Sequence, residues 1–154
     1  MALHVLRRLP EGIRQRIVRL VKPAYTLGAM VFIEHEGQVL LVKPSYRWKW
    51  GMPGGLLDRR ERPAEAARRE ALEEVGAVIE LDPGDPIVVV ESVLQRIDFV
   101  FRARLADGVD PASIHPTSTE IEQLRWFAIA ELPEMQPEAS QAVRALLAAD
   151  QQGR

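Results

Sequence analysis

The alternation of apolar and polar positions along the chain predicts a sheet joined by short turns. Two apolar runs, over residues 26–35 and 38–44, flank Glu36-Gly37, a dipeptide typical of a tight hairpin turn. Further strands are expected in IVVVESVLQ (87–95), RIDFVFRARLA (96–106) and LRWFAIAELP (124–133). A long polar loop is expected between the last two of these strands.

Helical spacing of apolar residues predicts three helices. One spans about Pro63 to Val75, with Gly76 at its C-terminal end, and a second falls in SQAVRALLAA near the end of the chain. The third covers residues 11–22, where a narrow apolar stripe is flanked by arginines. We expect this helix to pack on the domain or on a second subunit, while a surface that touches RNA or lipid is the alternative.

These elements predict one domain of the α+β or α/β class, with helices packed on a mixed sheet. The expected domain covers residues 25–154, and residues 1–24 form an amphipathic helical extension that could support a homodimer. The length of 154 residues suits a single domain with a real core.

Composition excludes several classes of function. The net charge of -2 argues against partners held by a global field, such as nucleic acid or an anionic membrane. The chain has no cysteine, which removes disulfides, thiolate nucleophiles and cysteine-ligated zinc. No apolar run is long enough to span a membrane, and the first residues do not form a signal peptide, so we expect a cytoplasmic protein.

The predicted middle helix carries an acidic cluster. Glu70, Glu73 and Glu74 lie at i, i+3 and i+4, on one face beside an alanine stripe that should face the sheet. Like charges at this spacing repel, and a hard cation such as Mg²⁺ or Mn²⁺ would remove that repulsion. The alternative is a solvated helix face with i to i+4 pairs, for example Glu65 with Arg69.

The spacing of the preceding residues decides between these readings. Gly55 is followed by five residues and Glu61, then seven residues and Arg69-Glu70, and the stretch continues as Ala-Leu-Glu-Glu-Val-Gly-Ala. Residues 55–77 thus resemble the Nudix box, G-x5-E-x7-R-E-U-x-E-E-x-G-U, with alanine at both positions marked U. The resemblance extends to WGMPGG (50–55) and EIEQLRWFAIAELP (120–133). It implies the Nudix fold, a mixed β-sheet sandwiched between helices, with a loop-helix-loop box.

The resemblance to Nudix hydrolases also implies roles for single residues. Glu70, Glu73 and Glu74 become metal ligands, and the backbone carbonyl near Gly54 or Gly55 completes the shell. Arg69 and Glu61 form an ion pair that holds the loop and the helix in place. The general base is left open between Glu70 and Glu120, with Glu122 as the fallback. The implied catalytic set is Glu70, Glu73, Glu120 and Arg69.

The implied reaction is attack of water on a diphosphate linkage in a small nucleotide-like substrate, with Mg²⁺ or Mn²⁺. The leading candidates for the substrate are a nucleoside triphosphate, including an oxidised one, and ADP-ribose. The residues expected to meet the substrate are Lys43, Arg47, Lys49, Gly54 and Gly55, with Tyr46 and Trp48 available to stack on a base. The alternatives are a nucleotide sensor without activity and an RNA 5′-end pyrophosphohydrolase. Isopentenyl-diphosphate isomerase is set aside, because the chain lacks a cysteine.

Overall fold

The computed structural model describes residues 10–11, 13 and 24–152. The predicted helix over residues 11–22 lies outside the described residues, apart from Glu11 and Ile13. The described elements are β1 (Thr26–His35), β2 (Gln38–Pro44), β3 (Gly54–Leu56), α3 (Pro63–Val75), β4 (Ile79–Leu81), β5 (Ile87–Glu91), β6 (Arg96–Leu105), the 3-10 turn η1 (Pro111–Ser113), β7 (Ile121–Ala128) and α4 (Pro137–Gln152). No described helix is long and apolar enough to cross a membrane.

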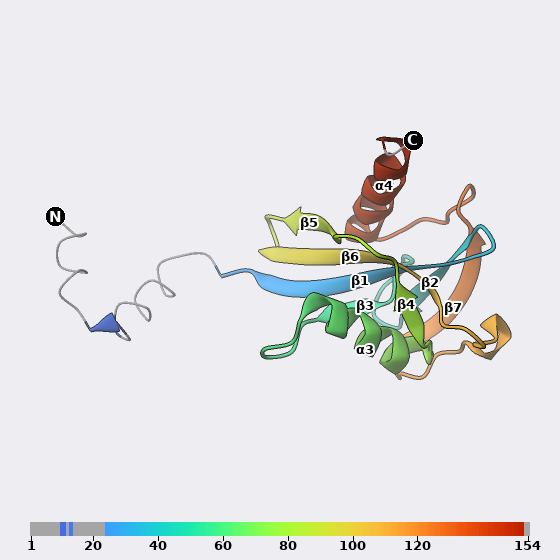
Figure 1. The fold of residues 1–154 in the computed structure, drawn as a ribbon, viewed down its shortest axis with the longest axis horizontal. Helices are drawn as coiled ribbons and strands as arrows, with labels where there is room; N and C mark the ends of the chain where they lie inside the picture. Colours follow the sequence, from blue (N-terminus) through green and yellow to red (C-terminus); the bar gives the residue numbers. More distant parts are fainter. Residues whose placement is uncertain (1–9, 12, 14–23, 153–154) are drawn as a thin grey trace.

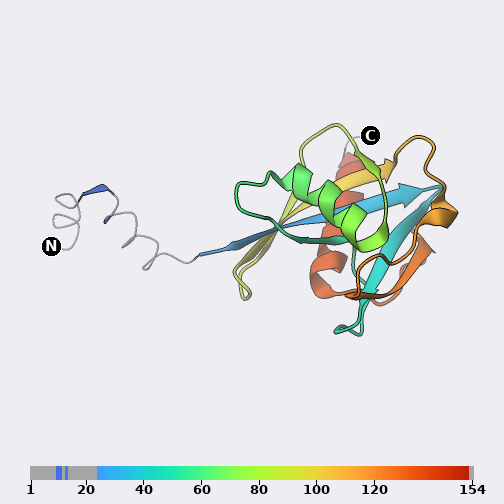
Figure 2. The same cartoon turned by 90° about the horizontal axis from the view of Figure 1, so that it is seen from below.

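The sheet is mixed, as the sequence predicts. Its strands follow the order β4-β6-β1-β2-β7, with β3 added beside β1 and β5 beside β6 (Figure 1). β1 and β6 run parallel from Thr26 opposite Arg96 to Glu34 opposite Arg104, and the other strand pairs are antiparallel. The helices α3 and α4 lie on opposite faces of the sheet (Figures 1 and 2). The predicted mixed sheet between helices is therefore confirmed.

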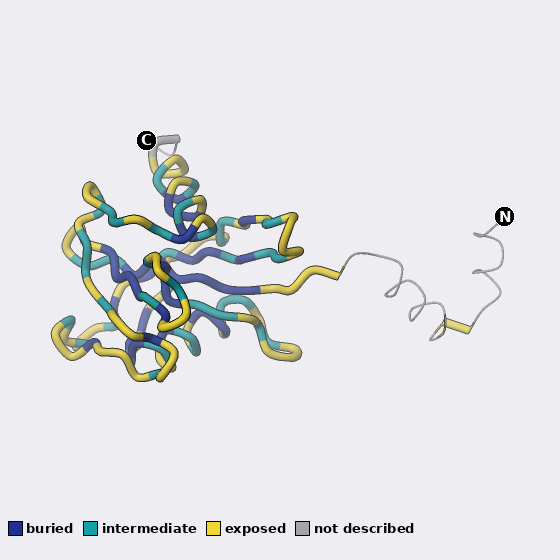
Figure 3. The backbone as a smooth tube through the Cα atoms, turned by 180° about the vertical axis from the view of Figure 1, so that it is seen from behind, coloured by how far each residue is buried: buried dark blue, intermediate teal, exposed yellow. Residues whose placement is uncertain are grey.

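Residues along the central strands alternate between two cores. Ala29, Val31 and Ile33 of β1 belong to the core under α3, whereas Met30 and Phe32 belong to the core under α4. Both faces of β1 are thus covered, which explains its continuous apolar run. The central strands are accordingly the darkest part of the burial map, and the loops are exposed (Figure 3).

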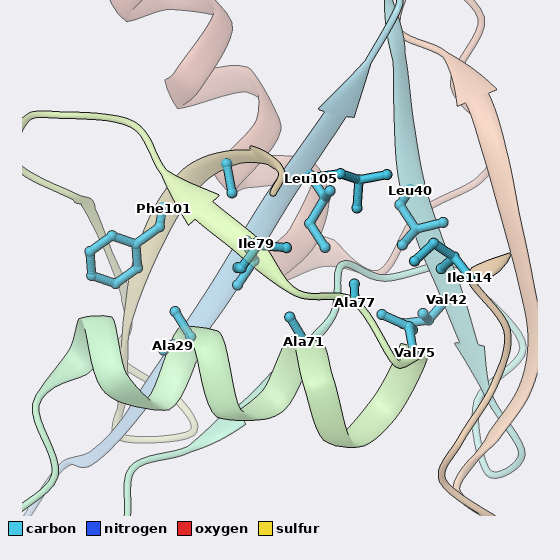
Figure 4. Close-up of a cluster of buried hydrophobic side chains, with 14 of the residues drawn as sticks. Ala29, Leu40, Val42, Ala71, Val75, Ala77, Ile79, Phe101, Leu105 and Ile114 are labelled. Carbon is cyan, nitrogen blue, oxygen red and sulfur yellow. The ribbon is translucent and has the colours of Figure 1, made fainter. Parts of the chain in front are cut away.

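The core under α3 is built with small side chains on the helix. Ala66, Ala67, Ala71 and Val75 are fully buried in this core. Figure 4 shows Ala71 and Val75 on the side of α3 that faces the sheet. Alanines fill little space, so the helix can lie close to β1 and β3. This close packing brings the acidic residues of the next helix face to the edge of β3.

Local geometry explains where the elements turn and end. Glu36 and Gly37 both have positive φ, at 46° and 75°, as a two-residue hairpin of this hand requires. α3 begins at Pro63, and it ends because Gly76 adopts a left-handed conformation with φ of 66°. The loop predicted as polar between β6 and β7 contains the turn η1 and buries Ile114 in the core under α3.

Candidate functional site

A cleft of about 520 Å³ opens between α3, β3 and the loop that precedes β7. It contains all the acidic residues proposed from the sequence as ligands, together with the glycine turn. Its lining residues are Tyr46, Gly54, Gly55, Leu56, Glu70, Glu73, Glu74, Arg96, Ser118 and Glu120. Four carboxylates from two separate segments of the chain therefore share one cleft.

The glycines of β3 allow the helix to approach this closely. A Cβ atom on Gly55 would lie 2.3 Å from Oε1 of Glu70. A Cβ atom on Gly54 would lie 2.2 Å from the Ala29 carbonyl oxygen, and φ of Gly54 is 152°. A larger residue at Gly54 would push β3 away from β1, and one at Gly55 would displace the Glu70 side chain.

Among the acidic residues of the cleft, Glu74 is the one whose pKa is raised by burial. Its Oε2 accepts a hydrogen bond from the Gly54 backbone N–H at 2.9 Å. This hydrogen bond lowers the pKa of Glu74, but burial has the larger, opposite effect, and the pKa rises to about 7. The charges of Glu70, Glu120 and Glu73 add to the rise in pKa. The site thus holds negative charge that is costly without a cation.

Arg69 connects the loop, the strand and the helix around the cleft. Its Nε and Nη2 donate to the two oxygens of Glu61, at 2.8 and 2.9 Å, and Nη2 also donates to the Leu56 carbonyl at 3.1 Å. The hydrogen bond from Arg69 is the main reason why the pKa of Glu61 falls to about 2. The ion pair expected from the family resemblance is therefore present.

The alternative pairing of Glu65 with Arg69 is wrong. The Glu65 carboxylate instead accepts from the Arg62 backbone N–H at 3.0 Å, at the first turn of α3. Arg69 donates through Nη1 to Glu70 at 2.8 Å and to Glu73 at 3.2 Å. Glu70 and Glu73 are thus both bonded to Arg69, and the Arg69–Glu73 contact is itself an i to i+4 pair.

The oxygen atoms that line the cleft are of the kind that a hard divalent cation binds. Carboxylate oxygens and backbone carbonyls are the ligands that Mg²⁺ and Mn²⁺ prefer. Within the described part of the chain, no three His, Cys, Asp or Glu side chains already converge on one point as a closed site would. One carboxylate oxygen of Glu70 and one of Glu73 accept from Arg69.

Glu120 and Glu122, the two loop candidates for a general base, are separated by the structure. Glu120 is exposed and lines the cleft, and its carbonyl accepts from the Ser45 backbone N–H at 2.8 Å. Glu122 lies beside Lys43 and Trp48 in a different hollow. The geometry therefore brings Glu120, and not Glu122, to the acidic cluster.

The three basic residues expected to meet the substrate do not gather in the cleft. Arg47 donates to Gln136 at 2.8 Å and pairs with Glu138, in a hollow adjoining the cleft. Lys49 pairs with Glu134 at 2.7 Å, and Lys43 lines the hollow beside Glu122. Tyr46, which is 68% exposed, borders all these hollows, whereas Trp48 is 92% exposed and does not line the cleft.

Arg96 was missed by the sequence reasoning. It is the first residue of β6 and lines both the cleft and the adjoining hollow. Its guanidinium is held by Asp98, which is 1% exposed. The signal was present in the sequence: an aspartate inside an apolar strand needs a partner, and Arg96 stands two positions earlier on the same strand face.

Known proteins are similar to the chain in sequence and in fold. A family model for the NUDIX domain matches residues 24–148. A CMP-5'-(N-acetyl-N-hydroxy-3-aminopropyl)phosphonate hydrolase from Streptomyces rubellomurinus is 32% identical over 115 residues, covering 70% of this chain and 54% of the relative. The 8-oxo-dGDP phosphatase NUDT18 from Mus musculus is 33% identical over 119 residues, covering 75% of this chain and 36% of the relative.

The chain thus spans about half of the first relative and about a third of the second. Among solved structures, a NUDIX hydrolase from Nitrosomonas europaea is 27% identical with a TM-score of 0.67. That comparison covers 81% of this chain and 69% of the other.

Proposed function

The chain belongs to the NUDIX family, and from this premise we propose that it is a metal-dependent hydrolase that cleaves a diphosphate linkage in a nucleotide derivative. One observation carries the proposal. The carboxylates of Glu70, Glu73, Glu74 and Glu120 line one cleft beside the glycines of β3. Such a cluster is unfavourable in an empty surface groove and useful around a cation that binds phosphate.

In this proposal Glu70, Glu73, Glu74 and the Gly54 carbonyl hold Mg²⁺ or Mn²⁺. When bound, the cation lowers the pKa of the attacking water and neutralises charge on the phosphoryl oxygens. Arg69 has a positioning role, because it fixes the loop of Glu61 and the β3 carbonyl of Leu56 against α3. Its loss would act through the geometry of the carboxylates.

We favour Glu120 as the general base. Its carboxylate lies in the cleft, and among the described residues no hydrogen bond to that carboxylate is found. Oε1 of Glu70, in contrast, accepts from Arg69. Glu120 would take a proton from water as the water oxygen bonds to phosphorus. The bond from that phosphorus to the bridging oxygen then breaks, and the bridging oxygen leaves with the other phosphate.

The substrate we propose is a nucleoside triphosphate, including an oxidised one, or ADP-ribose. The names of the Streptomyces and mouse relatives support a nucleotide, since they describe a CMP conjugate and 8-oxo-dGDP. Tyr46, which lines the cleft and is 68% exposed, is available to stack on a base there.

The test is turnover of a panel containing nucleoside triphosphates, 8-oxo-dGTP, ADP-ribose and a 5′-triphosphorylated RNA. Each is assayed with Mg²⁺, with Mn²⁺ and with EDTA, for wild type, Glu74→Gln and Glu131→Gln. Glu131 is exposed and lies in the turn after β7, outside the cleft, so it is the matched control. Metal-dependent turnover that is lost only in Glu74→Gln supports the proposal. Tight nucleotide binding without turnover would instead support a sensor.

A further inference from the structure

Arg96 is the one cationic side chain among the described residues that line the acidic cleft. We propose that Arg96 binds the phosphate oxygens of the substrate, with Asp98 as the positioning residue that aims it. This inference rests on the proposed function and names a residue that grips the diphosphate.

Asp98 holds one edge of the guanidinium and leaves the other available. Arg96 Nε lies 2.8 Å from both oxygens of Asp98, and Nη2 lies 2.7 Å from Oδ1. No bond from Nη1 to another described residue is found. Asp98 is 1% exposed, while the Arg96 side chain is 26% exposed. The buried carboxylate therefore fixes the arginine, and Arg96 itself lines the cleft.

The neighbouring strand is shaped around this pair. Gly28 of β1 lies directly opposite Asp98 in the parallel register. A Cβ atom at Gly28 would lie 2.1 Å from Oδ1 of Asp98 and 2.9 Å from Nη2 of Arg96. A glycine is therefore required there for the aspartate and the arginine to keep their places.

Arg96 supplies the one positive charge among the described residues of an otherwise acidic cleft. A diphosphate entering the cleft meets Glu70, Glu73, Glu74 and Glu120, which repel it. A guanidinium presents parallel N–H donors that match phosphate oxygens. The nearby Arg47 is already engaged with Glu138 and Gln136.

The position of Arg96 also suits a phosphate chain. Arg96, Gly54, Glu74 and Tyr46 line both the cleft and the adjoining hollow. A diphosphate bound in the cleft near Gly54 and Glu74 would therefore lie beside Arg96.

The competing explanation is a purely structural ion pair at the start of β6. Binding of methylenediphosphonate with Mg²⁺, measured by calorimetry, separates the two, since this probe contains no base and is not hydrolysed. Arg96→Gln is compared with wild type and with Arg102→Gln. Arg102 lies on the same strand but pairs with Glu34 and Asp150, outside the cleft.

We expect Arg96→Gln to weaken binding of the probe by about 10- to 100-fold. We expect Arg102→Gln to match wild type, and Mn²⁺ binding to stay unchanged in both variants. Because Arg96→Gln leaves a buried aspartate alone, the double variant Arg96→Gln with Asp98→Asn is measured as well. The same loss of probe binding in a folded double variant supports the proposal.

Wild-type affinity for methylenediphosphonate in both folded variants overturns the proposal, even if wild type hydrolyses nucleotides. Conversely, Arg96-dependent binding of the probe supports it even if no nucleotide is turned over, in which case the proposed hydrolysis fails alone. Kinetics give a second readout: Arg96→Gln should raise KM for an active substrate. A substrate whose KM and kcat are both unchanged in Arg96→Gln contradicts the inference.

Discussion

Replacing Glu74 by glutamine should stabilise the metal-free protein above neutral pH. The pKa of Glu74 is raised from 4.5 to about 7, mainly by burial. At about 1.4 kcal/mol per pKa unit, the ionised carboxylate costs the fold up to about 3 kcal/mol. The folded state binds the proton more tightly, so the free energy of unfolding of wild type falls as pH rises from 4.5 to about 7. Glutamine has no charge to bury and can still accept from the Gly54 N–H.

The assay is urea unfolding in EDTA at pH 4.5 and pH 8, followed by tryptophan fluorescence, for wild type, Glu74→Gln and Glu131→Gln. We expect Glu74→Gln to exceed wild type by up to about 3 kcal/mol at pH 8, and the gap to close near pH 4.5. Adding Mg²⁺ at pH 8 should stabilise wild type more than the variant. A gap that does not change with pH, or a variant less stable than wild type at pH 8, would refute the reasoning.

Three further predictions concern the other residues of the cleft. Gly55→Ala should weaken Mn²⁺ binding about tenfold or more, because the added Cβ would lie 2.3 Å from Oε1 of Glu70 and displace that carboxylate. An Mn²⁺ titration that gives the wild-type affinity would contradict this prediction. Glu120→Gln should lower kcat by about 10²- to 10⁴-fold, whereas Glu122→Gln should not; equal effects in the steady-state assay would exclude the assigned base. Arg69→Gln should lower both Tm and activity, since it frees the loop and the helix from each other; a melting curve like that of wild type would argue against this positioning role.

The sequence predicts a helix or strand correctly where the apolar spacing and the end residues within that segment are sufficient to define it. The alanine stripe, Pro63 and Gly76 predict α3 with its observed bounds, and the Glu36-Gly37 turn predicts the first hairpin. The sequence pattern does not predict β3 and β4 as separate strands, because segments of three residues are too short to show a periodicity. Their pairing depends on β1 and β6, which lie far from them in sequence.

The acidic part of the site was predictable because one helix face and one spacing pattern define it. The basic part was not. The nearness of Lys49 to the glycine turn in sequence predicts a contact with the substrate, yet its charge is paired with Glu134. Arg96 reaches the cleft only because β6 pairs in parallel with β1, a long-range arrangement that local sequence does not reveal. Asp98, an isolated carboxylate in an apolar strand, was the available clue.

The central claim is that the carboxylates of this cleft are gathered for a divalent cation. Its most direct test is Mn²⁺ binding followed by electron paramagnetic resonance, in wild type, Glu74→Gln and Glu131→Gln at pH 8. The account predicts that wild type and Glu131→Gln bind Mn²⁺ alike, that Mg²⁺ competes for the site, and that Glu74→Gln binds at least about tenfold more weakly. Equal Mn²⁺ affinity in wild type and Glu74→Gln would contradict it.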